Sequence, residues 1–355
     1  MPKRFPSFLL LLGLAGTSLS CSPLYVLRAG WEEAKILGRR RPIDHVVNDP
    51  ATDARTRAKL ELVQQARDFA RHSLDLAAGE SYTTYSWVDS DTLLLVVSAA
   101  QKDRFQPYTW WFPIVGRVPY KGFFKFEEAH AQVARLAAQG YDTYVRPSGA
   151  FSTLGWFNDP LLNTVLRYDD IDLVSTVIHE ITHNTLYLSS QVAFNESYAN
   201  FVGDRGAILF FCEREGPTSE ACAEAADSWH DTRTYGRFIT AFIDSLRALY
   251  ARTDLTRDEK IARREDVFAG ARQRFTAHVI PELRTRAYRG FPNRQLNNAT
   301  LIGTHIYYER LDLFEDIYQQ FGGDLVSSVR AIEKAARSNP NDPYAALDSL
   351  LQPQR

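Results

Sequence analysis

His179, Glu180 and His183 form the pattern H-E-x-x-H, in which the residue types and their spacing can bind a metal ion. On a helix, positions four apart lie on one face, so the two imidazoles can reach the same ion. Glu180 lies beside them, where its carboxylate could accept a proton from a metal-bound water. The alternative is that two structural histidines share a helix face by chance.

The segment that carries this pattern, residues 172–188, is predicted to be a helix on independent grounds. Asp169 and Asp170 are candidate N-cap residues just before it. Apolar residues recur through the segment at helical spacing. They are Leu173, Val174, Val177, Ile178, Ile181 and Leu186.

A catalytic zinc ion usually has three protein ligands and a water. No Gly-x-x-His follows His183, but an Asn-Glu-x-x-Ala segment begins a second predicted helix, residues 195–211. Two antiparallel helices joined by a short loop would bring Glu196 to the face of His179 and His183. Glu196 is therefore the predicted third ligand, unless it is merely an acidic residue in a first helical turn. Asn200, one turn later, is predicted to hydrogen-bond a ligand imidazole.

This set of residues predicts metal-assisted hydrolysis. Zinc lowers the pKa of its bound water, Glu180 accepts the proton, and the same carboxylate can deliver it to a leaving amine. A donor is also needed for the developing oxyanion. Tyr307, Tyr308 and His305 are the candidates, and the sequence does not select among them.

Residues 150–157, just before the motif helix, are the candidate edge strand for an extended peptide substrate. Gly149 and Gly155 would allow close backbone approach, and Trp156 could form a pocket wall. A buried strand with aromatic core residues is the alternative. The predicted substrate-binding residues are Ser152, Thr153, Leu154, Gly155 and Trp156.

The N-terminus resembles an export signal. Lys3 and Arg4 precede an apolar run too short to span a bilayer, and small residues follow as far as Cys21. We expect residues 1–20 to be a lipoprotein-type signal peptide and Cys21 to be lipidated. Ordinary signal-peptide cleavage nearby is the alternative. Ser22 favours the outer membrane, so the periplasmic side of a bacterial cell envelope is the expected location.

Two further cysteines and the overall charge narrow the class of protein. Cys212 and Cys222 could form a short disulfide in an oxidising compartment or remain free thiols. The formal net charge of −2 gives no support to nucleic-acid binding. The expected partners are a peptide or protein substrate and the membrane, through a lipid anchor.

The remaining pattern predicts an α+β fold with a small mixed sheet and a largely helical C-terminal half. Residues 21–355 are expected to form one domain, helical from about residue 229. Residues 82–88 and 92–98 are predicted to form a hairpin, and residues 141–145 a strand. The predicted helices are residues 29–76, interrupted near residue 40, and residues 126–140, 235–252, 257–288, 298–321 and 324–337.

Several stretches make the chain similar to a known family, the predicted bacterial aminopeptidases of the gluzincin type, from Cys21 to about Phe314. Trp111 and Arg117 stand where that family has cysteines, so a local disulfide is absent here. Besides H-E-x-x-H and its Glu196 partner, the matching stretches are residues 39–43, 48–52, 151–160, 193–197 and 297–299, with Tyr307.

The resemblance implies a gluzincin-like metallopeptidase fold, with His179, His183 and Glu196 as zinc ligands and Glu180 as catalytic base. It makes Tyr307 the preferred oxyanion donor. The implied activity is zinc-dependent peptide hydrolysis in the cell envelope, most simply by an aminopeptidase. The alternatives are an envelope endopeptidase and a non-catalytic lipoprotein that binds zinc or peptides.

Overall fold

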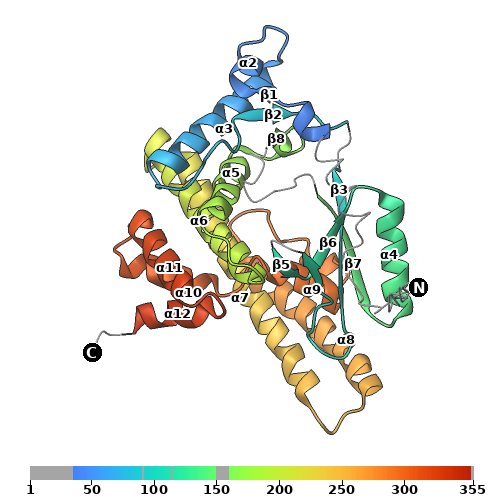
Figure 1. Cartoon of the computed structure of the whole chain (residues 1–355). Coiled ribbons are helices and arrows are strands. Elements are labelled where there is room, and N and C mark those ends of the chain that lie inside the picture. The colour runs from blue at the N-terminus through green and yellow to red at the C-terminus, as the bar shows by residue number, and fades with distance from the viewer. Residues whose placement is uncertain (1–34, 90–91, 113–114, 149–159, 353–355) are drawn as a thin grey trace, which may run out of the picture.

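The computed structural model describes residues 35–89, 92–112, 115–148 and 160–352 (Figure 1). Small sheets and many helices make an α+β fold, as predicted. The predicted signal peptide, Cys21 and the candidate edge strand at residues 150–157 lie outside the described residues. Among the described helices, none combines the length and apolar character needed to cross a bilayer.

The sheet nearest the predicted site is built around β3 (Leu94–Ala100), with β6 (Tyr120–Phe123) and β7 (Asp142–Ser148) antiparallel on either side. Side chains alternate between the two faces of a sheet. One face is apolar and packs under α4 (Phe126–Ala138); it includes Leu95, Val97, Ala99 and Phe123.

The opposite face of this sheet is more polar. Ser98 pairs with Tyr144, and Val96 pairs with Arg146, so Tyr144 and Arg146 point to the same side of β7. Helix α9 (Asn298–His305) covers part of this face, where a Cβ on Gly303 would lie 3.6 Å from the Tyr144 ring. Arg146 therefore projects toward the chain that follows α9.

The predicted hairpin between residues 82–88 and 92–98 is wrong. Strand β2 (Thr84–Ser86) pairs instead with β1 (Arg41–Pro42) and β8 (Leu161–Leu162) in a separate sheet. Strands β2 and β3 follow one another in the chain but belong to different sheets. A further short antiparallel pair consists of β4 (Trp110–Phe112) and β5 (Gly116–Val118).

The N-terminal helices are shorter than predicted. Helix α2 is Ile43–Val47, and α3 is Ala54–His72. The Asp53 side chain caps α3 by accepting a hydrogen bond from Thr56 N, so this helix begins at Ala54. Helix α3 packs in the main core against α5.

Helices α5 (Asp170–Thr185) and α6 (Val192–Glu215) form the antiparallel pair predicted for the two halves of the site. Asp169 caps α5 by accepting from Asp172 N. The pair approaches closely at Gly203, where an added Cβ would lie 2.8 Å from Ser175 O and 3.2 Å from His179 Cβ. A side chain there would push the helices apart.

At its C-terminal end, α6 is followed by Gly216, whose φ of +97° lets the chain turn into α7 (Glu220–Ala251). Cys212 and Cys222 form a disulfide across this turn. Of the two alternatives left by the sequence, the structure has the disulfide.

The helical half continues with α8 (Arg257–Arg274), α10 (Leu311–Gln320), α11 (Leu325–Ser338) and α12 (Pro343–Leu351). Three predicted boundaries are wrong. Helix α7 begins at Glu220 rather than near residue 235. The helix predicted over residues 257–288 ends at Arg274 and gives way to a π turn (Phe275–Val279) and short 3-10 turns. The helix predicted over 298–321 is two helices, broken where Arg310 adopts a left-handed φ of +53°.

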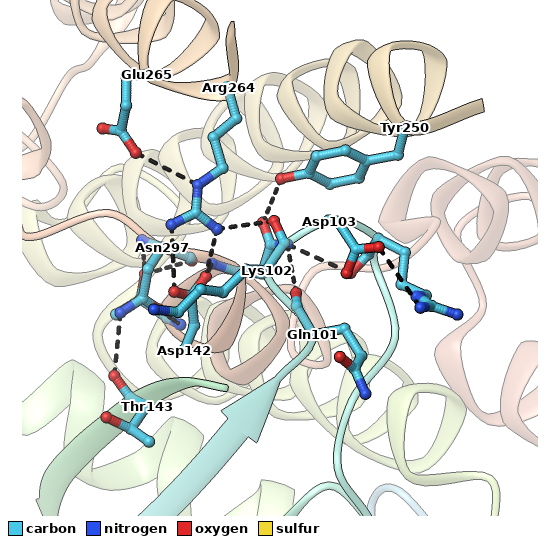
Figure 2. A network of polar contacts seen from close by, with 12 residues as sticks. Gln101, Lys102, Asp103, Asp142, Thr143, Tyr250, Arg264, Glu265 and Asn297 are labelled. Carbon is cyan, nitrogen blue, oxygen red and sulfur yellow. Dashed lines mark hydrogen bonds and ion pairs between the residues drawn. The ribbon is translucent and has the colours of Figure 1, made fainter. Parts of the chain in front are cut away.

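A buried polar cluster, which we name the Arg264 clamp, ties α8 to the sheet and to α9 (Figure 2). Arg264 donates to the Asp142 carboxylate at 2.7 Å and 3.2 Å. Asp142 is the first residue of β7, and it also accepts from the backbone N of Asn298, the first residue of α9, at 3.0 Å. Tyr250 in α7 donates to the Asn298 side chain at 2.9 Å. The clamp therefore fixes the start of β7 against the start of α9.

Candidate metal centre

Three potential metal ligands converge between α5 and α6. His179 Nε2 and His183 Nε2 lie 3.2 Å apart, and Glu196 Oε2 lies 3.4 Å from the first and 3.8 Å from the second. Within the described residues, this is the group of histidine, cysteine and acidic side chains placed to hold an ion. The structure thus brings together the three residues that the sequence predicted as ligands.

The separations among these atoms suit a zinc ion. A tetrahedral ion with ligands at about 2.0–2.1 Å requires neighbouring ligand atoms to be about 3.3 Å apart. The three observed distances bracket that value. Two neutral imidazoles and one carboxylate are also a donor set that catalytic zinc sites use, with a fourth position left for water or substrate.

The helix pair is held in register by a residue next to the carboxylate. Asn195 accepts from Leu188 N at 2.9 Å and donates to Leu188 O at 2.8 Å, so it closes both hydrogen bonds of one loop residue. This fixes the loop from α5 to α6. Glu196 is thereby presented to His179 and His183, and its pKa lies well below the usual value, because bonds from both imidazoles outweigh the effect of burial.

A second carboxylate on α6 lies deeper along the same pair. Asp204 accepts a hydrogen bond from Ser175 Oγ at 2.6 Å, and burial raises the pKa of this carboxyl. Its charge also acts on His179. The sequence pattern gave no sign of Asp204, although its place two turns after Glu196 puts both on one face of α6.

Glu180 lies on α5 beside the ligands and is only partly buried. Its charge contributes to raising the pKa of two nearby phenols, Tyr168 and Tyr307, although burial is the main cause at both. The carboxylate predicted to move a proton is therefore close enough to Tyr307 for its charge to act on the phenol.

Tyr307 is brought to the centre by two side chains of α6. Asn200 Nδ2 donates to Tyr307 O at 2.7 Å. Ser197 Oγ donates to Ile306 O at 3.0 Å and accepts from Glu309 N at 2.8 Å. The predicted bond from Asn200 to a ligand imidazole is thus replaced by one to the backbone of Tyr307, because the side chain of Asn200 is turned toward the segment after α9.

The phenol of Tyr307 remains protonated in this environment. Burial raises its pKa well above the ordinary value, and the Glu196 carboxylate raises it further, while Arg146 lowers it. Arg146 Nη2 donates to the phenol oxygen at 3.2 Å, which leaves the phenol hydrogen to point elsewhere. Tyr307 can therefore act as a hydrogen-bond donor.

The other two candidate oxyanion donors contact groups other than the metal ligands. Tyr308 donates to the Tyr288 hydroxyl at 3.4 Å and packs on the Tyr235 ring in the second core cluster. His305 is buried, lies 3.9 Å from the Glu309 carboxylate, and has its pKa lowered to about 4, mainly by burial. Of the three, Tyr307 is the one placed near Glu196.

Two residues near the centre were missed by sequence reasoning. Tyr120 on β6 packs with Tyr307, and the charge of Glu196 acts on its phenol. Arg146 on β7 contacts Tyr307 directly. Alternation along the predicted strand could have assigned Arg146 to the face of Tyr144, but nothing local indicates what that face meets.

Comparison with known proteins gives one family. No curated protein and no solved structure matches the chain. The model of the family described as "Putative aminopeptidase" matches residues 24–347. Because this match spans most of the 355 residues, the chain belongs to that family.

Proposed function

We propose that this protein is a zinc metallopeptidase of the gluzincin type that acts as an aminopeptidase. One observation carries the proposal: His179, His183 and Glu196 converge at zinc-ligand spacing, and Glu180 directly follows His179 on the same helix. A purely structural metal site has no use for that adjacent carboxylate. The family match supports peptide hydrolysis.

Each residue of the site has its own role in the proposed peptide hydrolysis. Bound through His179, His183 and Glu196, zinc would supply a Lewis acid that polarises a carbonyl and acidifies water. The Glu180 carboxylate accepts a proton from the attacking water and returns it to the leaving amine. The Tyr307 phenol donates a hydrogen bond to the oxygen on which charge develops. Asn200 holds Tyr307 in place through its backbone.

The proposed location is the periplasmic side of the cell envelope, with a lipid anchor at Cys21 on the outer membrane. The basic residues, short apolar run and cysteine at the N-terminus support export and lipidation. The Cys212–Cys222 disulfide also fits an oxidising compartment. After the leader, one domain would carry the whole catalytic site.

Elemental analysis of the soluble chain from Ser22 onward tests the metal. We expect about one zinc per chain, because three protein ligands are present. His183→Ala should abolish this zinc. His130→Ala, on helix α4, is the matched control and should retain it. Purified protein without metal, and with no uptake of added zinc, would contradict the proposal.

The role of Glu180 is tested by Glu180→Gln, which keeps the size of the side chain and removes the base. We expect full zinc content and a loss of peptide hydrolysis of at least about 100-fold, the usual contribution of a general base. Activity at the wild-type level in this variant would exclude the proposed mechanism.

Peptides with free and acetylated N-termini separate an aminopeptidase from an endopeptidase. We expect hydrolysis of the free peptides and release of the first residue. Equal cleavage of the acetylated forms would replace the aminopeptidase with an endopeptidase. Zinc binding without hydrolysis of any peptide would support a non-catalytic binding protein.

A further inference from the structure

Arg146 is a partly buried cation at the candidate metal centre that has no carboxylate partner among the described residues. Within the described part of the chain, its guanidinium donates one hydrogen bond, to the neutral Tyr307 phenol. A guanidinium carries five N–H donors, so most of them are left for another acceptor. Arginines removed from water are ordinarily paired.

Two other arginines that the fold covers are paired with carboxylates. Arg264 donates twice to Asp142, and Arg205 donates to Glu315 through two nitrogens. Both acceptor carboxylates are buried; Arg264 is buried as well, and Arg205 is partly buried. Arg146 differs from these two because its anion is not supplied by the described part of the protein.

The surroundings of Arg146 favour an incoming anion. Its pKa is raised: burial lowers it, but interactions with Tyr307, Tyr120 and Tyr144, and with the Glu196 carboxylate, outweigh burial. Three of these four groups are phenols, which carry no charge at neutral pH. Glu196 is directed at the two histidines. The described groups that act on the cation are therefore polar, and the one that is charged, Glu196, is engaged by the two histidines.

The position of Arg146 limits which part of a peptide it can reach. One hydrogen bond of 3.2 Å joins it to Tyr307. A second hydrogen bond, of about 3 Å, would join Tyr307 to the carbonyl oxygen of the scissile bond. One residue of extended chain spans about 3.5 Å. These lengths keep an acceptor bound by Arg146 within about one residue of the scissile bond. On the N-terminal side of that bond an aminopeptidase substrate presents a cationic ammonium, so the acceptor belongs to the residue that follows the bond.

We propose that Arg146 binds the free α-carboxylate of that residue, so that dipeptides are the preferred substrates. This rests on the proposed peptidase function and names its substrate class. The planar fork of a guanidinium matches the two oxygens of a carboxylate, which a backbone carbonyl in a longer peptide cannot reproduce. The Arg264 clamp supports this role, because it holds β7, which carries Arg146, against α9, which leads to Tyr307.

The test compares Leu-Leu with Leu-Leu-amide, which differ in this carboxylate, on the zinc-loaded protein. We expect kcat/KM for Leu-Leu to be about 10- to 100-fold higher, the effect of losing a charge-assisted hydrogen bond. Arg146→Gln should bring the two values within about threefold of each other. Arg146→Lys, which keeps the charge and loses the fork, should give an intermediate ratio. Arg135→Gln, on α4 at the other face of the sheet, is the matched control and should keep the wild-type ratio.

Tyr307→Phe distinguishes a binding role from one exerted through the phenol. This variant should lower kcat for both substrates and leave their ratio unchanged. A uniform loss on both substrates in Arg146→Gln, with the ratio kept, would overturn the proposal, since Arg146 would then act only through Tyr307. Equal hydrolysis of both substrates by the wild type would also overturn it, while the proposed peptidase function would stand.

Binding measurements keep the substrate class testable if no peptide is hydrolysed and the proposed function fails. Calorimetric titration of zinc-loaded Glu180→Gln with the same two compounds should show Leu-Leu binding at least about 10-fold more tightly. Adding Arg146→Gln should remove that difference. Equal affinities, or no binding of either compound, would overturn the assignment of Arg146.

Discussion

Arg264 binds the first residue of strand β7, and Arg146 lies further along that strand. The two arginines differ in whether the protein supplies an anion to pair with them. The side chains of Arg264 and Asp142 are only 8% and 6% exposed, and the two form a bidentate ion pair inside the protein. Arg146 is on the same strand as Asp142, and the only hydrogen-bond partner of its guanidinium in the described residues is a phenol. Arg264 has a hydrogen-bonded carboxylate within the protein, whereas the described residues provide none for Arg146.

The comparison distinguishes a charge that orders the fold from a charge that is available to bind a ligand. A buried pair adds little net stability but is costly to break, because the remaining charge stays in a poor solvent. Asp142 also binds the first residue of α9, so the pair orders two elements at once. An arginine without its anion contributes little to folding and can contribute to ligand binding. The tests below start with the pair.

Breaking the Arg264 clamp is expected to have the largest effect on stability. Arg264→Met should lower the free energy of unfolding by about 3–5 kcal/mol, because it leaves the Asp142 carboxylate buried without its cation. Urea unfolding followed by circular dichroism measures this. Arg252→Met removes an arginine whose Asp254 partner is exposed, and should leave the midpoint unchanged. Equal effects of the two variants would show that burial does not distinguish these pairs.

Increasing the distance between α5 and α6 is expected to have the next largest effect on stability. Gly203→Ala places a methyl group against Ser175 O and His179 Cβ, so it should destabilise the protein by about 1–3 kcal/mol. It should also weaken zinc binding, because α5 and α6 carry the ligands on opposite sides of the contact. Gly270→Ala in α8 meets only the flexible end of Arg274 and should be neutral or stabilising. A fully stable Gly203→Ala with unchanged zinc affinity would contradict the packing described here.

Asn200→Ala should lower the free energy of unfolding by about 1–2 kcal/mol, since Tyr307 O loses its hydrogen bond. Zinc affinity should stay the same, because Asn200 contacts Tyr307 rather than an imidazole. Competition with a chelator of known affinity measures it. A decrease of 10- to 100-fold in zinc affinity, as expected for a residue that orients a ligand, would favour the role predicted from the sequence.

Arg146→Met should have the smallest effect on folding. Its free energy of unfolding should differ from wild type by about 1 kcal/mol or less, because one hydrogen bond to a phenol is lost and no carboxylate is left unpaired. The same urea titration measures it. A loss as large as that of Arg264→Met would mean that Arg146 is structural and would remove the contrast.

The helices of the candidate site could be predicted from the sequence because their signals are local. Helix α5 has a capping Asp169 and an apolar stripe, and both histidines lie within one turn of each other. Glu196 follows after a short loop, so an antiparallel pair leaves few other places for it. The convergence of these residues therefore depends on neighbouring segments alone.

The rest of the arrangement depends on contacts between distant segments. Strand order cannot be inferred from adjacent β-rich runs, and residues 82–88 and 92–98 in fact join different sheets. The partners of Asn200 and Arg146 lie 107 and 161 residues away, in both cases at Tyr307. Composition and spacing near either residue say nothing about Tyr307, so their roles emerged only from the structure.

One turn of α6 has a consequence for how the protein matures. Asn195, Glu196 and Ser197 point about 100° apart and contact the preceding loop, the preceding helix and the segment after α9. The last of these contacts needs Ile306 and Glu309, which are synthesised more than a hundred residues later. A chain that stops before them would lack Tyr307, and it would also lack Phe314 of α10, on which Phe194 and Tyr198 of α6 pack on either side of Glu196 in the sequence. The residues of the candidate centre are therefore assembled only once the C-terminal part of the chain has been made.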